Sequence, residues 1–190
     1  MTIMSDHQYL TYEEFGRKFF EVAVTEERVG AAIAEIAGDE FELGPIGQGP
    51  GKIAKVTAKV RIQEPRVTRS NGELITFAIR IPLEIDMVID LRIDKPKFMV
   101  FGEISLSAVA RAAEPLLLIL DVQKPRPSDI AIHVTSKSLR AELLRIVAGV
   151  DAEIRRFIAA HVAGEIDSPA SLKAKVIDVA ERLDAAWDGV

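Results

Sequence analysis

The sequence predicts one α+β domain in which a long, strongly bent antiparallel sheet wraps against a long C-terminal helix, with a pair of helices at the N-terminus. Three observations predict this fold class. Apolar residues recur at helical spacing in residues 11–38 and 138–164, whereas they alternate with polar residues through most of 52–135. The chain of 190 residues is 48% hydrophobic and 28% charged, which suits a single domain over residues 1–190 and excludes a disordered protein.

Composition and charge exclude several classes of function. The chain has no cysteine, so disulfides, thiolate metal sites and cysteine nucleophiles are absent. A net charge of −5 argues against a nucleic-acid partner, because a phosphate backbone requires a clustered basic surface. The first residues have neither the basic flank nor the apolar run of a secretory signal, and no segment is apolar enough to span a membrane. We therefore expect a cytoplasmic protein with no transmembrane segment and no nucleic-acid partner.

The helical pair at residues 11–38 is predicted from its capping residues. Thr11 and Glu14 have capping-box spacing, so the first helix should begin at residue 12. Thr25 is a good N-cap for the second helix, which Gly38 would end. The apolar stripe of the first helix consists of Phe15, Phe19, Phe20 and Ala23.

Residues 44–51 read Gly-Pro-Ile-Gly-Gln-Gly-Pro-Gly and precede Lys52, which invites comparison with phosphate-binding loops. The spacing does not fit. A Walker loop requires glycine where this chain has Ile46, and serine or threonine where it has Ile53. We therefore expect a plain connector with turn-forming glycines and prolines.

Alternation with a period of two predicts the sheet at residues 52–135. A first strand over 54–62 is interrupted by Pro65, and Ser70-Asn71-Gly72 supplies a hairpin turn. The following alternation, from Ile75 to Ile93, is roughly 20 residues long, beyond the usual length of a strand. Its residues prefer extended structure, so we expect one twisted strand kinked near Pro82 rather than a hairpin.

Further strands are predicted at 98–106, 116–122 and 130–134, with Gly102 a candidate bend. Residues 108–113 are ambiguous, because alanine favours helix while its neighbours here alternate.

Two helices are predicted after the sheet. Ser138 is a good N-cap for the long helix over 138–164, in which Gly149 would permit close packing or a bend. Ser168-Pro169 then begins a terminal helix over 169–187.

Candidate catalytic and metal-binding residues are few. The three histidines, His7, His133 and His161, have no companion motif, and no set of residues has the spacing of a zinc site, so we expect no metal and no cofactor. Glu84, Asp86 and Asp90 share one face of the long strand, where they would hold a cation or act as catalytic carboxylates. The simpler interpretation is a solvated face paired across strands, with Arg80, Arg92, Lys55 and Lys59 as partners.

The predicted faces together favour an internal cavity. A bent apolar sheet against a long apolar helix either packs solid or encloses a tunnel, and the low aromatic content of 6% supplies few large side chains to fill it. The candidate tunnel wall consists of Ile79, Ile81, Leu83, Ile85, Met87, Phe98, Val100, Ile104, Ile154 and Phe157.

This layout resembles the tubular lipid-binding (TULIP) superfamily. The likeness rests on the helices at 12–37, the extended run Leu74–Asp94 that contains Pro82, the later strands, and the long helix after Ser138. It implies a bent sheet around a long helix with an apolar tunnel, and it transfers no catalytic residue. Two segments, Gly38–Pro45 and Val147–Phe157, also resemble uncharacterised actinobacterial proteins. This second resemblance implies no activity for the chain.

One function is favoured and two alternatives stay open. We expect a non-enzymatic binding or carrier protein for a lipid or other long apolar small molecule. The first alternative is an enzyme of apolar secondary metabolism, with Glu84, Asp86 or His133 as acid or base inside the cup. The second is a solid-core structural protein that forms a homodimer through strand edges or the terminal helix. Transient membrane contact through Lys124, Arg126 and Lys137 is weighed against a solvated turn, which we favour.

Overall fold

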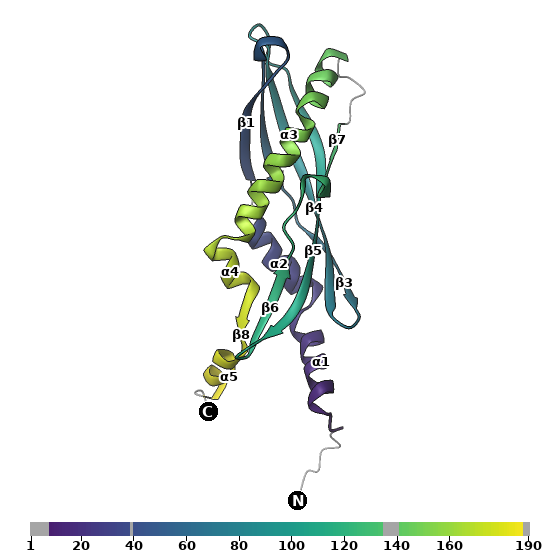
Figure 1. Ribbon diagram of the computed structural model, residues 1–190, viewed down its shortest axis with the longest axis vertical. Coiled ribbons are helices and arrows are strands. Elements are labelled where there is room, and N and C mark those ends of the chain that lie inside the picture. Colours follow the sequence, from purple (N-terminus) through teal and green to yellow (C-terminus); the bar gives the residue numbers. More distant parts are fainter. Residues whose placement is uncertain (1–7, 39, 135–140, 188–190) are drawn as a thin grey trace, which may run out of the picture.

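The computed structural model describes residues 8–38, 40–134 and 141–187, and it has an eight-stranded antiparallel sheet that curls around a long helix (Figure 1). The predicted fold class is confirmed. The elements are α1 (Tyr12–Ala23), α2 (Glu26–Ala37), β1 (Glu40–Gln48), β2 (Ala54–Ile62), β3 (Arg66–Asn71), β4 (Ile75–Asp90), β5 (Lys97–Ala113), β6 (Leu117–Val122), β7 (Ile130–His133), α3 (Ala141–Ile166), α4 (Pro169–Lys175), β8 (Val176–Asp178) and α5 (Val179–Trp187). Short 3-10 turns lie at Pro50–Lys52 and Pro127–Asp129.

The sheet has the strand order β1-β2-β4-β5-β6-β8, with β3 also paired to β4 and β7 also paired to β5. The centre of the sheet is the pair β4 and β5, of 16 and 17 residues, which stay in register from Thr76 opposite Val109 to Val88 opposite Lys97. These two strands run through most of the length of the molecule (Figure 1).

Strand β4 is continuous through Pro82, as the alternation predicts. Its first half pairs with β3 and its second half with β2, and Pro82 lies where one partner replaces the other. The Gln63 N–H donates to the Pro82 carbonyl at 2.9 Å, on the side of the strand where β2 ends and β3 begins. Because the missing N–H of proline falls in this gap, the strand loses no ladder hydrogen bond there.

Alternation along β4 separates an apolar inner face, which packs against α3, from a polar outer face. The inner residues are at most 1% exposed: Phe77, Ile79, Ile81, Leu83, Ile85, Met87 and Ile89. Helix α3 contributes a matching stripe of Val147, Val150, Ile154, Ile158, Val162 and Ile166. At 26 residues, α3 is about 39 Å long. This length covers the half of the sheet that lies away from the two chain termini (Figure 1).

The N-terminal helical pair is confirmed at both caps. The Glu14 N–H donates to the Thr11 hydroxyl at 3.2 Å, and the Thr11 N–H donates to the Glu14 carboxylate at 2.8 Å. The Arg28 N–H donates to the Thr25 hydroxyl at 3.3 Å, and Gly38 ends α2 with a φ of 73°. Ser138, the predicted N-cap of the long helix, lies outside the described residues.

The prediction of a plain connector at 44–51 is wrong for its first half, which belongs to β1. The register with β2 shifts between Leu43 and Ile46, so the strand contains a bulge. Gly44 has a φ of 103°, and a Cβ there would lie 2.6 Å from the Val56 carbonyl oxygen. The Gly-Pro pair thus permits a bulge within an edge strand, and does not end the strand.

The prediction of one helix over 169–187 is also wrong. Residues Val176–Asp178 form β8, which pairs with β6 and separates α4 from α5. The free edge of β6 offers hydrogen bonds to this segment, and Val176 and Ile177 are β-branched residues that suit a strand. The ambiguous residues 108–113 belong to β5, where β6 pairs with them.

Candidate functional site

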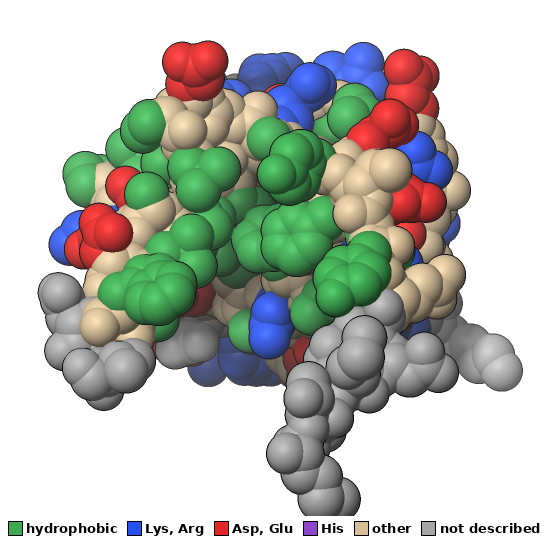
Figure 2. Space-filling model, turned by 90° about the horizontal axis from the view of Figure 1, so that it is seen from below, with side chains coloured by type: hydrophobic (Ala, Val, Ile, Leu, Met, Phe, Trp, Pro, Cys, Tyr) green, Lys and Arg blue, Asp and Glu red, His purple; other side chains and the backbone are tan. Residues whose placement is uncertain are grey.

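The lower half of the inner face of the sheet is the part that α3 leaves uncovered. We call the end of the molecule that carries both chain termini the lower end (Figure 1). There α1 stands on one side, and β6, β8 and α5 stand on the other. None of the residues of α1 or of α5 is fully buried. Seen from this end, hydrophobic side chains gather around a hollow (Figure 2).

The sheet supplies the inner surface of this hollow with small and aliphatic side chains. Three inner-face rows of opposed residues step toward the lower end: Ala108 with Val122, Ala110 with Leu120, and Ala112 with Leu118 and Ile177. The first two rows are buried, whereas Ala112 is exposed and Ile177 is 40% exposed. Alanine on β5 leaves room that a larger side chain would fill, so the space opens at the third row.

Helix α1 supplies a row of aromatic rings. Phe19 and Phe20 pack against the core, with ring centroids 6.0 Å apart, and Phe15 stacks on Phe19 at 6.5 Å. Exposure rises along this row to 61% for Phe15 and 98% for Tyr12. The apolar stripe therefore begins in the core and continues outward to the end of the molecule.

Helix α5 repeats this arrangement on the other side. Val179 packs against the core, and its N–H donates to the Leu116 carbonyl at 3.0 Å. Leu183 and Trp187 follow at helical spacing and are 50% and 75% exposed. We call the exposed side chains at this end the apolar rim: Tyr9, Leu10, Tyr12, Phe15, Leu116, Leu183 and Trp187.

Two arginines hold the C-terminal end of α1. Arg28 Nη1 donates to the carbonyls of Val22 and Ala23 at 3.2 and 3.0 Å. Arg69 Nη1, on β3, donates to the carbonyls of Glu21 and Val24 at 2.8 and 3.1 Å. Guanidinium groups satisfy carbonyls that have no partner within the helix, and their charge complements the helix dipole. The position of α1 is therefore set at its core end, and its aromatic row extends from there.

Eight of the ten predicted tunnel-wall residues lie together between the sheet and α3. They are Ile79, Ile81, Leu83, Ile85, Met87, Val100, Ile104 and Ile154, each at most 1% exposed. A side chain with so little exposed surface borders almost no space for a water molecule, so in this structure these eight pack closely. Phe98 is partly buried against the same core.

Phe157, the tenth predicted residue, does not join this group. It is 50% exposed and lies beside Glu153, Arg156 and Ala160. The buried stripe of α3 passes through Ile154 and Ile158, and a position one residue before Ile158 is rotated by about 100° around the helix. Phe157 therefore falls outside the stripe, although its apolar character suggested otherwise.

The acidic residues of β4 lie on the outer face, away from α3. Arg61 on β2 donates to both Asp86 and Glu84, the latter at 3.1 Å, and these hydrogen bonds raise the pKa of the arginine. Lys95 lies 2.9 Å from Asp90, and its hydrogen bond lowers the pKa of that carboxyl. The acids thus form a solvated, paired face, but their ion-pair partners differ from those predicted: Lys59 pairs with Glu40 instead, and Arg80 pairs with Glu103. The enzyme hypothesis required the acids inside the cup, and the structure places them on the opposite side of the sheet.

The histidines do not form a site either. His133 is exposed on β7, and the ring of His161 on α3 stacks on Phe41 of β1 with centroids 3.8 Å apart. His7 lies outside the described residues. Over the described ranges, no group of three or more histidine, aspartate or glutamate side chains is arranged to hold a metal ion.

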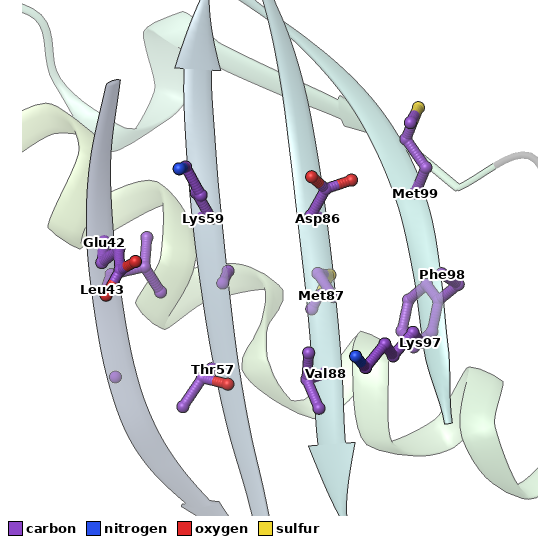
Figure 3. A pocket seen from close by; sticks show the side chains of 12 residues that line it. Glu42, Leu43, Thr57, Lys59, Asp86, Met87, Val88, Lys97, Phe98 and Met99 are labelled. Atoms are coloured by element: carbon purple, nitrogen blue, oxygen red, sulfur yellow. The ribbon is translucent and has the colours of Figure 1, made fainter. Parts of the chain in front are cut away.

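A second hollow, of about 690 Å³, lies on the outer face of β1, β2, β4 and β5 (Figure 3). Its lining mixes charged, polar and apolar side chains, including Thr57, Lys59, Asp86 and Met99. Lys59 binds Glu40 at 2.8 Å, and Asp86 is held by Arg61. Two of the charged side chains in this hollow therefore already have partners, which weakens their attraction for a ligand.

The basic turn after β6 is also neutralised. Lys124 lies 2.6 Å from Asp167, and Arg126 lies 3.2 Å from Asp129. Lys137 lies outside the described residues. The favoured interpretation, a solvated turn, agrees with these pairs. Among the helices that the structure describes, none is both long and apolar enough to cross a membrane.

Sequence reasoning did not identify the hollow at the lower end. The available signals were two amphipathic helices near the chain ends, and the concentration of tyrosine and tryptophan in or just before them. The alanines of β5 carried no signal, because only the pairing of β5 with β6 places them on a shared inner surface.

No family model and no curated protein matches the sequence. Among solved structures, a crystal structure of lipopolysaccharide binding protein is similar over 80% of this chain and 36% of that chain, with a TM-score of 0.44 and 12% sequence identity. The chain thus spans well under half of the length of that protein. A similarity at this level assigns neither a family nor a ligand to this chain.

Proposed function

We propose that this protein binds a lipid or another long apolar small molecule, and that the ligand enters through the hollow at the lower end. The observation that carries the proposal is the uncovered inner face around Ala112 and Ile177, flanked by two helices whose apolar stripes run from the core to the rim. Apolar surface left open in this way favours occupation by an apolar partner.

Burial of an alkyl chain supplies the binding energy in this proposal. Each methylene that leaves water contributes about 0.8 kcal/mol, so about ten methylenes would contribute ~8 kcal/mol before the costs of ordering the ligand. An alkyl chain could therefore bind the aliphatic side chains of β5 and β6 with useful affinity without any polar contact. The resemblance to the TULIP superfamily implies the same class of ligand.

In this proposal, the predicted tunnel-wall residues lie deeper in the protein than the hollow and would contact the inner end of a long ligand. Beyond the buried rows of Ala108 and Ala110, the inner face continues to Phe77 and then to the residues between β4 and α3. A long ligand would reach Ile79 and Ile81 by displacing side chains that are packed in the ligand-free protein. We expect binding to be accompanied by a small separation of α3 from the sheet.

The test uses two matched substitutions. Ala112→Phe places a ring in the hollow, and Ala113→Phe places the same ring on the outer face of the same strand. Fluorescently labelled palmitate should bind the unmodified chain and the Ala113→Phe variant, whereas Ala112→Phe should weaken binding at least tenfold. Native mass spectrometry of protein from its own host should show an apolar adduct that denaturing extraction releases.

Two outcomes would overturn the proposal. Equal binding of palmitate by both variants would show that the ligand does not bind in this hollow. The absence of binding to the unmodified chain, together with an adduct-free mass, would favour the alternative of a solid-core interaction protein.

A further inference from the structure

The aromatic residues with a polar group are confined to one end of the molecule. The chain has one tryptophan and two tyrosines. All three belong to the apolar rim, with Trp187 75% exposed, Tyr12 98% exposed and Tyr9 92% exposed. Tryptophan and tyrosine are the residues that prefer the boundary between water and the hydrocarbon region of a membrane.

We propose that the apolar rim docks on the surface of a zwitterionic phospholipid bilayer, with the N-terminal turn of α1 in the headgroup region. The outer end of α1 exposes Tyr12 and Phe15, whereas Phe19 packs against the core, so the helix presents its aromatic side chains at the tip of the lower end. Docking would place the mouth of the hollow against the lipid, so that an apolar ligand need not cross water. The docking surface goes beyond the proposed ligand and can be tested without it.

The exposed area of the rim favours a partner. Its four aromatic side chains expose roughly 600 Å², at the upper limit of the largest apolar patch that a monomeric protein usually shows. The leucines of the rim, including Leu183 and Leu116 at 50% and 48% exposure, add to this area.

The shape of the lower end favours a membrane over a second copy of the chain. A stable dimer needs about 800 Å² from each partner in close complementary contact. Here the surface is hollowed, and two hollowed ends facing each other would meet at their rims and leave a gap (Figure 2). Fluid acyl chains, in contrast, fill a concave surface.

Charge decides which lipid is expected. Helices α1 and α5 each carry one more acidic than basic residue: Glu13, Glu14 and Glu21 with Arg17 and Lys18, and Glu181 and Asp184 with Arg182. The basic turn that would attract an anionic surface is already paired with Asp129 and Asp167. Helices with a small excess of acidic residues do not attract an anionic surface, so we expect a neutral headgroup such as that of phosphatidylcholine, and anionic lipid should not strengthen binding.

Trp187 provides the test, since it is the only tryptophan and lies in the rim. We expect phosphatidylcholine vesicles to shift the Trp187 emission to shorter wavelength and to carry the full chain upward in a flotation gradient. Tyr12→Glu and Phe15→Glu should each lower the partition at least tenfold. Ile93→Glu is the matched control, because Ile93 is 98% exposed in the turn between β4 and β5, at the opposite end.

Each alternative outcome is distinct. Absence of both the emission shift and flotation would overturn the proposal, as would equal loss in the Ile93→Glu control. Binding that appears only with anionic lipid and disappears in salt would point to an electrostatic contact elsewhere. An emission shift that depends on protein concentration in the absence of vesicles would indicate that the rim binds a second copy of the chain, and this would overturn the proposal. Palmitate binding is measured without vesicles, so the proposed ligand site and the docking surface are tested separately.

Discussion

Gly102 on β5 lies so close to Ala131 on β7 that a Cβ added to Gly102 would be 2.9 Å from the Ala131 carbonyl oxygen. The clash is with backbone, which cannot rotate away as the end of a side chain can. Gly102 also lies opposite Leu83 on β4, so β5 is confined on both sides at this position. The glycine that the sequence marked as a candidate bend therefore serves a close approach between strands.

Gly102→Ala should destabilise the protein by about 2 kcal/mol, because the backbone of β5 or β7 must shift to make room. Urea unfolding measures the change. Gly164→Ala is the control, since nothing lies within 4 Å of a Cβ at that position of α3. It should stabilise the helix by about 0.5 to 1 kcal/mol. Equal effects of the two substitutions would contradict the close contact.

The neighbouring residues Ile154 and Phe157 should respond very differently to truncation. Ile154 is 1% exposed, so Ile154→Ala should leave a cavity and cost about 2 to 5 kcal/mol in unfolding free energy. Phe157→Ala should cost about 1 kcal/mol or less, because half of its ring is already in water. A larger loss from Phe157→Ala, measured in the same urea titration, would place Phe157 in the core after all.

Arg69→Ala should loosen α1 without unfolding the sheet. The substitution removes two hydrogen bonds from a charged donor to the carbonyls of Glu21 and Val24. We expect amide hydrogen exchange in Tyr12–Ala23 to accelerate at least tenfold, whereas exchange in β4 and β5 stays slow. Arg17→Ala is the control, because Arg17 pairs with Glu13 on the exposed surface. Unchanged exchange in the Arg69→Ala variant would show that α1 is held by its aromatic contacts alone.

The ion pair of Lys95 with Asp90 should make a pH-dependent contribution to stability. The hydrogen bond from Lys95 lowers the pKa of Asp90 in the folded state, so the contribution is present above the unfolded pKa and is lost as pH falls through the folded pKa. Lys95→Met should therefore lower the melting temperature slightly near neutral pH and have no effect at a pH well below about 4. An equal decrease at both pH values would indicate that Lys95 acts through packing rather than charge.

Much of the fold was predictable because its signals are local. The alternation around Pro82 identified one long strand, and the capping residues Thr11 and Thr25 located the starts of the helical pair. The same alternation assigned Glu84 and Asp86 to the outer face, whereas their partner there, Arg61 on β2, was not among those predicted. In each case the residue pattern within one element determines which side chains face the core.

The errors occurred where an element depends on a partner distant in the sequence. Val176–Asp178 became a strand because the edge of β6 lies beside it, and Gly44 marked a bulge because β2 continues past it. Phe157 has the apolar character of a core residue, but the packing direction of α3 turns it to the solvent.

The sequence alone determined the class of the fold, the inner face of the long strand and the amphipathic character of the two terminal helices, because hydrophobic periodicity is a property of consecutive residues. Only the tertiary structure decided where apolar surface stays open. Three features are relations between distant segments: the length of α3 relative to the sheet, the alanines of β5 beside Leu118, and the placement of α1 and α5 on two sides of the same end of the molecule. Such relations are set by packing in three dimensions, which no local pattern encodes.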